Sequence, residues 1–144
     1  MLKSNDIDIL NTIYKNSRMA YDSTRIVASK CRDEELKNYL KRQLGHYAGS
    51  CREARTALES EGHDVQPVPA MQQIMSRAGI FMKTFRDKSK GNIAEIMYNG
   101  TNMGIADIAR CVNRSHNASD KTVHDAETLL SSEEKYADGL RKFL

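Results

Sequence analysis

The sequence predicts an all-α protein, an up-down-down-up four-helix bundle, and three observations lead to this prediction. Four long segments each repeat apolar residues at spacings of three and four, which is the period of an amphipathic helix. Two prolines, Pro67 and Pro69, are the only ones in the chain and share one connection, so no long segment is interrupted. That connection is long enough for the second and third helices to run in the same direction. With 144 residues, the chain is expected to form a single domain over 1–144.

The first two helices are expected over 5–30 and from Glu34 to just before Gly62. Asp33 is a candidate N-cap of the second helix, and Glu34 and Glu35 place negative charge in its first turn, where the helix dipole favours it. Gly62 is the expected C-terminal stop. The connection between the two helices is short, which makes them antiparallel neighbours.

The connection after Pro69 is expected to contain a short amphipathic helix over 70–87. Its apolar face would carry Met71, Ile74, Met75, Ala78, Phe81, Met82 and Phe85. Its end is basic. One interpretation is a crossover helix packed on the bundle, with methionines filling gaps; the other is a membrane-surface or partner-binding module within 70–90. We favour the crossover helix, because a membrane helix usually carries basic residues along its whole length.

The third and fourth helices are expected over 93–112 and from about Ser119 to the end of the chain. Gly100 and Gly104 lie one turn apart in the third helix, where each costs about 1 kcal/mol of helix propensity relative to alanine. Close packing against another backbone is the simplest use of these two glycines. Ser119 is a possible cap of the fourth helix.

Composition and charge exclude several classes of protein. The net charge of +3 comes from 22 basic and 19 acidic residues that are well interspersed, which is typical of a solvated helical surface rather than a nucleic-acid-binding stripe. No apolar run is long enough for a signal peptide or a membrane span, so we expect a cytoplasmic protein. The three cysteines form no CxxC pair, and we expect Cys51 and Cys111 to be small buried residues.

The chain resembles the ferritin-like superfamily, and within it a bacterial family of small domains of unknown function related to a group of stress-associated and spore-coat-like proteins. The similarity covers nearly the whole length. It depends on ELKNYLKRQLGHYAGSCREARTALESEGHDV, on QQIMSRAGIFMKTF in the crossover, and on IAEIMYNGTNMGIADIA. These are patterns of size and polarity rather than a signature. The resemblance implies a ferritin-like version of the bundle.

Ferritin-like di-iron sites use a glutamate from each of two helices and a Glu-x-x-His from each of the other two. This chain has Gln43 and His46 where one such pair would stand, and Glu133 and Tyr136 where the other would stand. Asp107 is the candidate from the third helix. One secure carboxylate and one imidazole cannot offset the charge of two iron ions in a dry core.

Two interpretations of these five residues remain open. In the first, a single transition-metal ion (iron, zinc or manganese) or a small polar ligand is surrounded by Gln43, His46, Glu133, Tyr136 and Asp107. In the second, these residues form a buried hydrogen-bond network in a core that has lost its metals. We favour the network, with no cofactor.

These observations predict a non-catalytic structural or interaction module. The competing hypothesis is a metal-binding oxidoreductase or iron-handling protein with an atypical site. No phosphate-binding glycine loop, nucleophile elbow or HExxH motif supports a common enzyme class. The expected assembly is a homodimer, since this is the commonest form of a soluble oligomer. A further protein partner would bind through residues 70–87, and nucleic acid is not expected as a partner.

Overall fold

The structure, a computed structural model, describes residues 1–69 and 86–144, and these are helical throughout apart from their connections. Within these residues, four long helices are α1 (Ser4–Lys30), α2 (Glu34–Glu59), α5 (Lys90–Arg114) and α6 (Asp120–Leu140). A short 3₁₀ helix, η1 (Arg141–Phe143), follows α6. The predicted all-α, four-helix architecture is confirmed for this part of the chain. Residues 70–85, which make up nearly all of the expected crossover helix over 70–87, lie outside the described residues.

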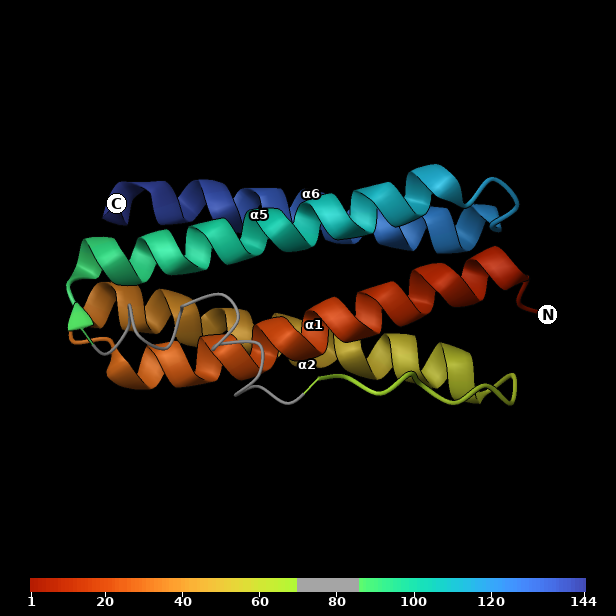
Figure 1. The fold of residues 1–144 in the computed structure, drawn as a ribbon, viewed down its shortest axis with the longest axis horizontal. Helices are drawn as coiled ribbons and strands as arrows, with labels where there is room; N and C mark the ends of the chain where they lie inside the picture. The colour runs from red at the N-terminus through yellow and green to blue at the C-terminus, as the bar shows by residue number, and fades with distance from the viewer. Residues whose placement is uncertain (70–85) are drawn as a thin grey trace.

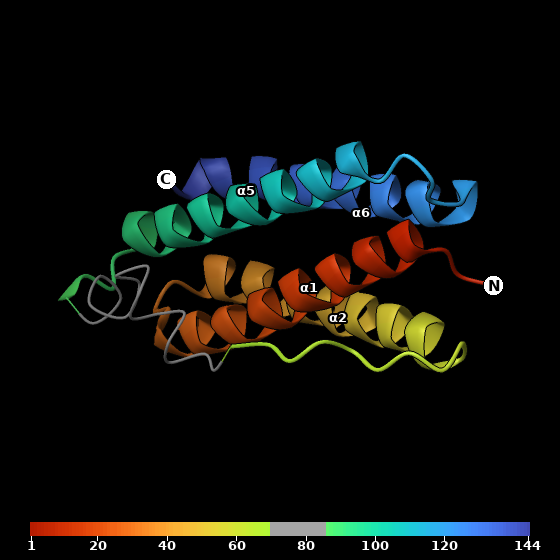
Figure 2. The same cartoon turned by 45° about the vertical axis from the view of Figure 1, so that its right-hand side comes forward.

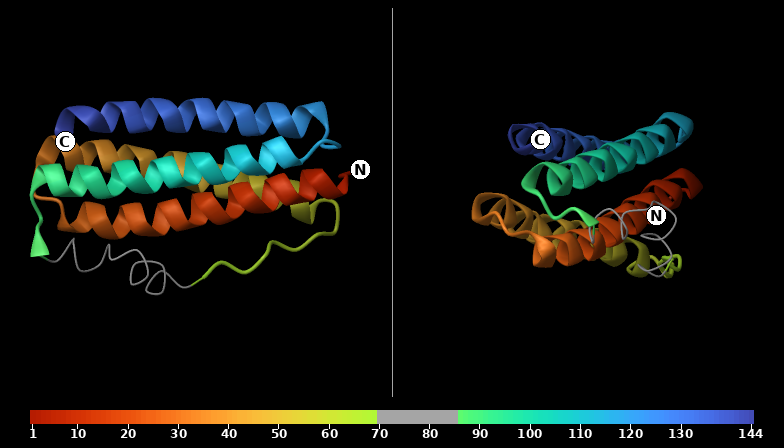
Figure 3. Two further views of the ribbon diagram at one scale, coloured as in Figure 1. Left: turned by 45° about the horizontal axis from the view of Figure 1, so that its top comes forward. Right: turned by 60° about the vertical axis from the view of Figure 1, so that its left-hand side comes forward.

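The helices form two pairs, with α1 beside α2 and α5 beside α6 (Figure 1). Within each pair the chain reverses direction, and the two pairs stack into a bundle (Figures 2 and 3). The N- and C-termini lie at opposite ends of its long axis (Figure 1). No helix in 1–69 or 86–144 is long and apolar enough to cross a membrane.

Local sequence sets most of the helix ends. The Asp33 carboxylate accepts a hydrogen bond from the Leu36 amide at 2.8 Å, and the Ser119 hydroxyl accepts one from the Thr122 amide at 3.3 Å. Each side chain pairs one of the amides that the first turn of a helix leaves unsatisfied. Gly62, three residues after the end of α2, has a φ of +80°, a conformation that favours glycine. These three predicted boundaries are confirmed.

The core consists of two apolar clusters, one toward each end of the bundle. The first contains Leu36 and Leu40 of α2 together with Ile93 of α5 and Leu140 of α6. The second is built around Ile9, Ile13, Leu58, Cys111 and Ala126. Between the two clusters, each helix buries at least one polar side chain. This central polar layer comprises Ser17, Thr24, Gln43, Thr101 and Glu133.

The close approach between helices lies elsewhere than predicted. Among the residues that the structure describes, a Cβ added at Gly100 would meet nothing within 4 Å, and one at Gly104 would lie 3.6 Å from Asn16 Oδ1, which is ordinary contact. The expectation for these two glycines is therefore wrong. Gly139 of α6 is the crowded position: a Cβ there would overlap the hydroxyl of Tyr39 and lie 2.8 Å from its Cζ. Because Gly139 has no side chain, the Tyr39 ring can lie against the backbone of α6 and its hydroxyl can donate a hydrogen bond to the Tyr136 carbonyl at 2.8 Å.

Candidate functional site

Glu133 of α6 is the acid at the centre of the bundle. Glu133 is buried, with only 7% of its surface exposed. The Gln43 amide donates a hydrogen bond to Glu133 Oε1 at 3.2 Å, and the Tyr47 hydroxyl donates one to Oε2 at 3.0 Å. Both donors come from α2, one turn apart, so the facing helix supplies one partner to each carboxylate oxygen. A buried polar group needs such partners, because an unpaired one costs about 1–3 kcal/mol.

The environment of Glu133 favours its neutral form. Burial raises the pKa of this carboxyl from 4.5 to about 7, although the hydrogen bonds from Tyr47 and Gln43 act in the opposite direction. Burial also raises the pKa of the Tyr47 phenol well above its usual value, and the adjacent Glu133 charge adds to that rise. A cationic group would have the opposite effect on both residues. The site is therefore built around a carboxyl that is close to half-protonated near neutral pH.

Three tyrosines form an aromatic cluster beside this acid. Tyr136, one turn after Glu133, stacks on Tyr39 with ring centroids 5.2 Å apart and planes 7° from parallel. Its ring also meets Tyr47 edge-on at 6.2 Å. The buried Tyr136 hydroxyl has no hydrogen-bond partner among the described residues, and neither has Thr24 Oγ1 in the polar layer. Burial raises the pKa of Tyr136, so its hydroxyl stays protonated.

The structure brings together three of the five residues predicted for the site: Gln43, Glu133 and Tyr136. Of the expected donors, only Gln43 bonds to the carboxyl, and the Tyr136 hydroxyl makes no hydrogen bond among the described residues. Asp107 lies apart from them, where it accepts a hydrogen bond from the Asn16 amide at 2.7 Å and lies 3.5 Å from Lys15 Nζ. Asn16 and Lys15 lower its pKa against the effect of partial burial. Asp107 is thus part of a surface contact between α1 and α5.

His46 is exposed, and the expectation that it would face the same point as Gln43 is wrong. Successive residues of an α-helix are rotated by about 100°, so the side chains of His46 and Tyr47 leave α2 in very different directions. The buried stripe of α2 continues from Gln43 to Tyr47, four residues later, rather than to His46. Tyr47 is the functional residue that the sequence analysis did not include. The signal was its place in the apolar stripe, which marked it only as a core residue.

The donor set at this centre does not fit a di-iron cluster. It consists of one carboxyl, one amide and phenols, whereas two iron ions need several bridging carboxylates to offset their charge. Among residues 1–69 and 86–144, no three or more histidine, cysteine, aspartate or glutamate side chains gather where they would hold a metal ion. The five-residue set predicted for a single ion is also divided, since His46 and Asp107 lie away from Glu133.

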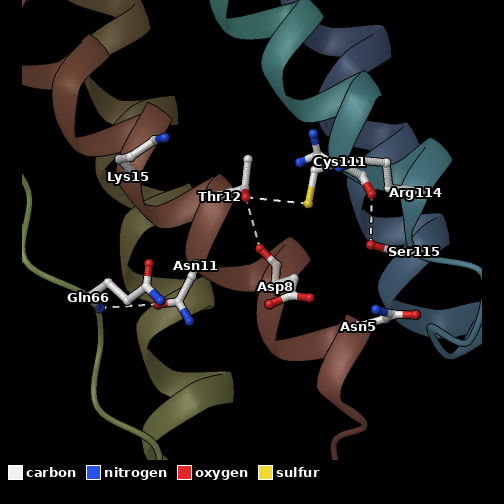
Figure 4. Close-up of a pocket in the computed structure, with 9 residues that line it drawn as sticks. All are labelled: Asn5, Asp8, Asn11, Thr12, Lys15, Gln66, Cys111, Arg114 and Ser115. Atoms are coloured by element: carbon white, nitrogen blue, oxygen red, sulfur yellow. Dashed lines mark hydrogen bonds between the residues drawn. The ribbon is translucent and has the colours of Figure 1, made fainter.

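A polar cavity of about 340 Å³ lies between α1 and the end of α5 (Figure 4). Thr12 Oγ1 donates to the Asp8 carbonyl at 2.8 Å and lies 3.4 Å from Cys111 Sγ. The Gln66 amide donates to Asn11 Oδ1 at 3.1 Å, which ties the segment after α2 to α1. Cys111 is buried as predicted, whereas Cys51 is only half-buried. Charges of both signs line the cavity, so it favours no one class of ligand.

Comparisons of the chain with protein-family models, with curated proteins and with solved structures find no match. What the central site can do chemically is set by its own residues. Their arrangement is a half-protonated acid, held by one amide and one phenol, at the centre of a four-helix protein.

Proposed function

We propose that this protein is a ferritin-like helical module without catalytic activity, which serves a structural or interaction role. The observation that carries the proposal is the environment of Glu133. A single carboxyl with one protein donor on each oxygen occupies the centre of the bundle, and this donor set has too few anionic oxygens to offset the charge of two iron ions.

The ferritin-like part of the proposal has two supports. One is the resemblance of the sequence patterns described above, and the other is the direction of the helices. In Figure 1 the chain runs in one direction along α1 and α6 and in the other along α2 and α5. This is the order expected for an up-down-down-up bundle with a long crossover between α2 and α5.

Metal analysis tests the lack of a metal site. The full chain would be expressed in medium supplemented with iron, zinc and manganese, purified without chelator, and analysed by mass spectrometry for metals. We expect far less than one equivalent of any transition metal per chain. One equivalent or more that is lost in Glu133→Gln would overturn the proposal, since this change removes the anionic ligand and keeps a hydrogen-bonding side chain.

His46→Ala is the matched variant for the alternative in which a single ion binds at an atypical site. If a metal is present and both Glu133→Gln and His46→Ala release it, the two residues act on one ion and the oxidoreductase or iron-handling hypothesis is favoured. If no metal is present in the unmodified chain, neither variant changes the metal content. That result supports the non-catalytic module.

The assembly that we propose is a homodimer. It is supported by the apolar pattern of residues 70–87 in the sequence. The described part of the chain offers no comparable apolar surface, because its exposed large hydrophobic residues are only Met1, Met103 and Leu144. These three do not form one patch, since the two termini lie at opposite ends of the bundle (Figure 1). Sedimentation velocity should give twice the 16.3 kDa mass of one chain. A mass of one chain at high protein concentration would refute the dimer.

A further inference from the structure

A groove of about 480 Å³ between α1 and α2 is strongly basic. All of its described lining residues belong to these two helices, which lie side by side (Figure 1). Four of them are arginines, namely Arg18, Arg25, Arg52 and Arg55, and one is an acid, Asp22. The formal charge of this lining is therefore +3, equal to the net charge of the whole chain.

Helix geometry gathers these arginines along the groove. Arg18 and Arg25 are seven residues apart on α1, which places them on the same face about 10 Å from one another along the axis. Arg52 and Arg55 are three residues apart on α2 and also share a face. Because α1 and α2 lie side by side, the pair on α1 and the pair on α2 line opposite walls of one groove. An extended ligand with two charged groups could contact both walls.

Two of the arginines are held in place by neighbours. Arg55 Nη2 donates a hydrogen bond to the Tyr14 hydroxyl at 2.6 Å, and its guanidinium lies over the Tyr14 ring at 5.2 Å. Tyr14 is 5% exposed, so it forms a rigid base for this contact. Arg18 Nε lies 3.2 Å from Asp22 Oδ2. A guanidinium has five N–H donors, so both arginines keep donors for a ligand.

The other two arginines lack such neighbours in the part of the chain that the structure describes. Arg25 and Arg52 are exposed, and neither has an ion-pair or hydrogen-bond partner among residues 1–69 and 86–144. The remaining stretch, 70–85, has the sequence AMQQIMSRAGIFMKTF, which contains no aspartate or glutamate. No carboxylate of that stretch can therefore neutralise them.

We propose that this groove binds a soluble small molecule that carries phosphate groups, such as a nucleoside diphosphate. The guanidinium fork matches phosphate oxygens in a bidentate geometry, and a lining charge of +3 suits a ligand with several negative charges. The cavity lies in the range of about 300–1,000 Å³ that is usual for small-molecule sites. The half-buried ring of Tyr21 provides an apolar surface for a base or sugar. This inference is independent of the proposed lack of catalysis.

Isothermal titration calorimetry on the full chain tests the proposal, with adenosine diphosphate, inorganic diphosphate and citrate as probes at low salt. We expect both phosphate probes to bind and the affinity to fall as salt is added. Citrate should bind more weakly. Equal binding of citrate and diphosphate would overturn the assignment to phosphate, and no binding of any probe at millimolar concentration would overturn the site itself.

Four variants locate the binding. Arg25→Gln and Arg52→Gln should each weaken diphosphate binding about tenfold or more, because a hydrogen bond to a charged group contributes about 1.5–3 kcal/mol. Asp22→Asn should strengthen binding, since it removes the one negative charge of the lining. Arg32→Gln is the matched control: it removes the same charge from an exposed position outside the groove and should change little.

Two outcomes would contradict the proposal even if binding is observed. A loss in Arg32→Gln as large as in Arg52→Gln would show that the probe responds to overall charge and not to the groove. Binding to vesicles of phosphatidylcholine and phosphatidylglycerol in the absence of binding to either soluble phosphate would identify a lipid surface instead. Circular dichroism of each variant should match that of the unmodified chain, since the exposed side chains of Arg25 and Arg52 make no hydrogen bond or ion pair among the described residues.

Discussion

Replacing Glu133 by glutamine should abolish much of the pH dependence of stability of this protein. The carboxyl has a pKa of about 7 when folded and 4.5 as its ordinary value. Between these values the folded state binds more protons than the unfolded state, so the free energy of unfolding falls as the pH rises. The contribution is complete below about pH 4.5 and lost above about pH 7. A pKa difference of this size corresponds to about 3 kcal/mol.

Glutamine suits this test because it can keep both hydrogen bonds. Its oxygen can accept from the Gln43 amide, and its own amide can donate to the Tyr47 hydroxyl oxygen in place of the bond that Tyr47 now donates. The substitution therefore removes the titrating charge and little else. Among residues 1–69 and 86–144, no charged side chain contacts this carboxyl, whose hydrogen-bond partners are Gln43 and Tyr47.

Urea unfolding followed by circular dichroism at about pH 5 and about pH 9 measures the effect. The unmodified chain should lose about 3 kcal/mol more than Glu133→Gln across this interval, because only the former must bury a carboxylate at the higher pH. Glu134→Gln is the control, one residue later and exposed. Parallel pH profiles of the unmodified chain and Glu133→Gln would refute the reasoning, whatever their absolute stability.

Two further predictions concern stability. Gly139→Ala should destabilise the protein by about 1–3 kcal/mol, because the new Cβ would overlap Tyr39. Gly100→Ala should stabilise it by up to about 1 kcal/mol, because no described atom lies within 4 Å of the new Cβ and alanine has the higher helix propensity. Equal effects of the two alanines in thermal unfolding would contradict this account. Asp6→Asn should lower the free energy of unfolding by about 2 kcal/mol near neutral pH, because the buried Asp6 carboxylate accepts hydrogen bonds from the Ser119 amide and hydroxyl. This loss should shrink at acid pH, where Asp6 of the unmodified chain becomes protonated. Although burial opposes it, these bonds lower the pKa of Asp6, so a cost that grows on acidification would be inconsistent with them.

Helix positions could be predicted from the sequence because their causes are local. The N-caps Asp33 and Ser119 and the stop at Gly62 each act within a few residues, and the structure places them as expected. The site was predicted less well, because it depends on how α2 is rotated about its axis. The spacing of Gln43 and His46 fits a ligand pair, but the buried stripe includes Gln43 and Tyr47 and leaves His46 in solvent.

The basic groove could not be predicted from the sequence for a different reason. Arg18 and Arg25 lie far along the chain from Arg52 and Arg55, and the acidic and basic residues of both segments alternate. Only the pairing of α1 with α2 brings the four arginines to one surface, where Asp22 is the single acid among the described lining residues. Charge interspersed in sequence is therefore no guide to charge in space once two helices pack together.

The central polar layer gives the bundle a property that its apolar clusters cannot. A shift of α6 along α2 by one turn would replace apolar neighbours by other apolar neighbours in both clusters, at modest cost. The same shift would separate Glu133 from Gln43 and Tyr47 and leave a buried carboxyl unpaired, at a cost of about 1–3 kcal/mol or more. Buried polar groups fix helix register in some coiled coils, and we propose the same effect for this polar layer. In the function that we propose, this acid has a structural use, and its raised pKa is the consequence of its burial in the core.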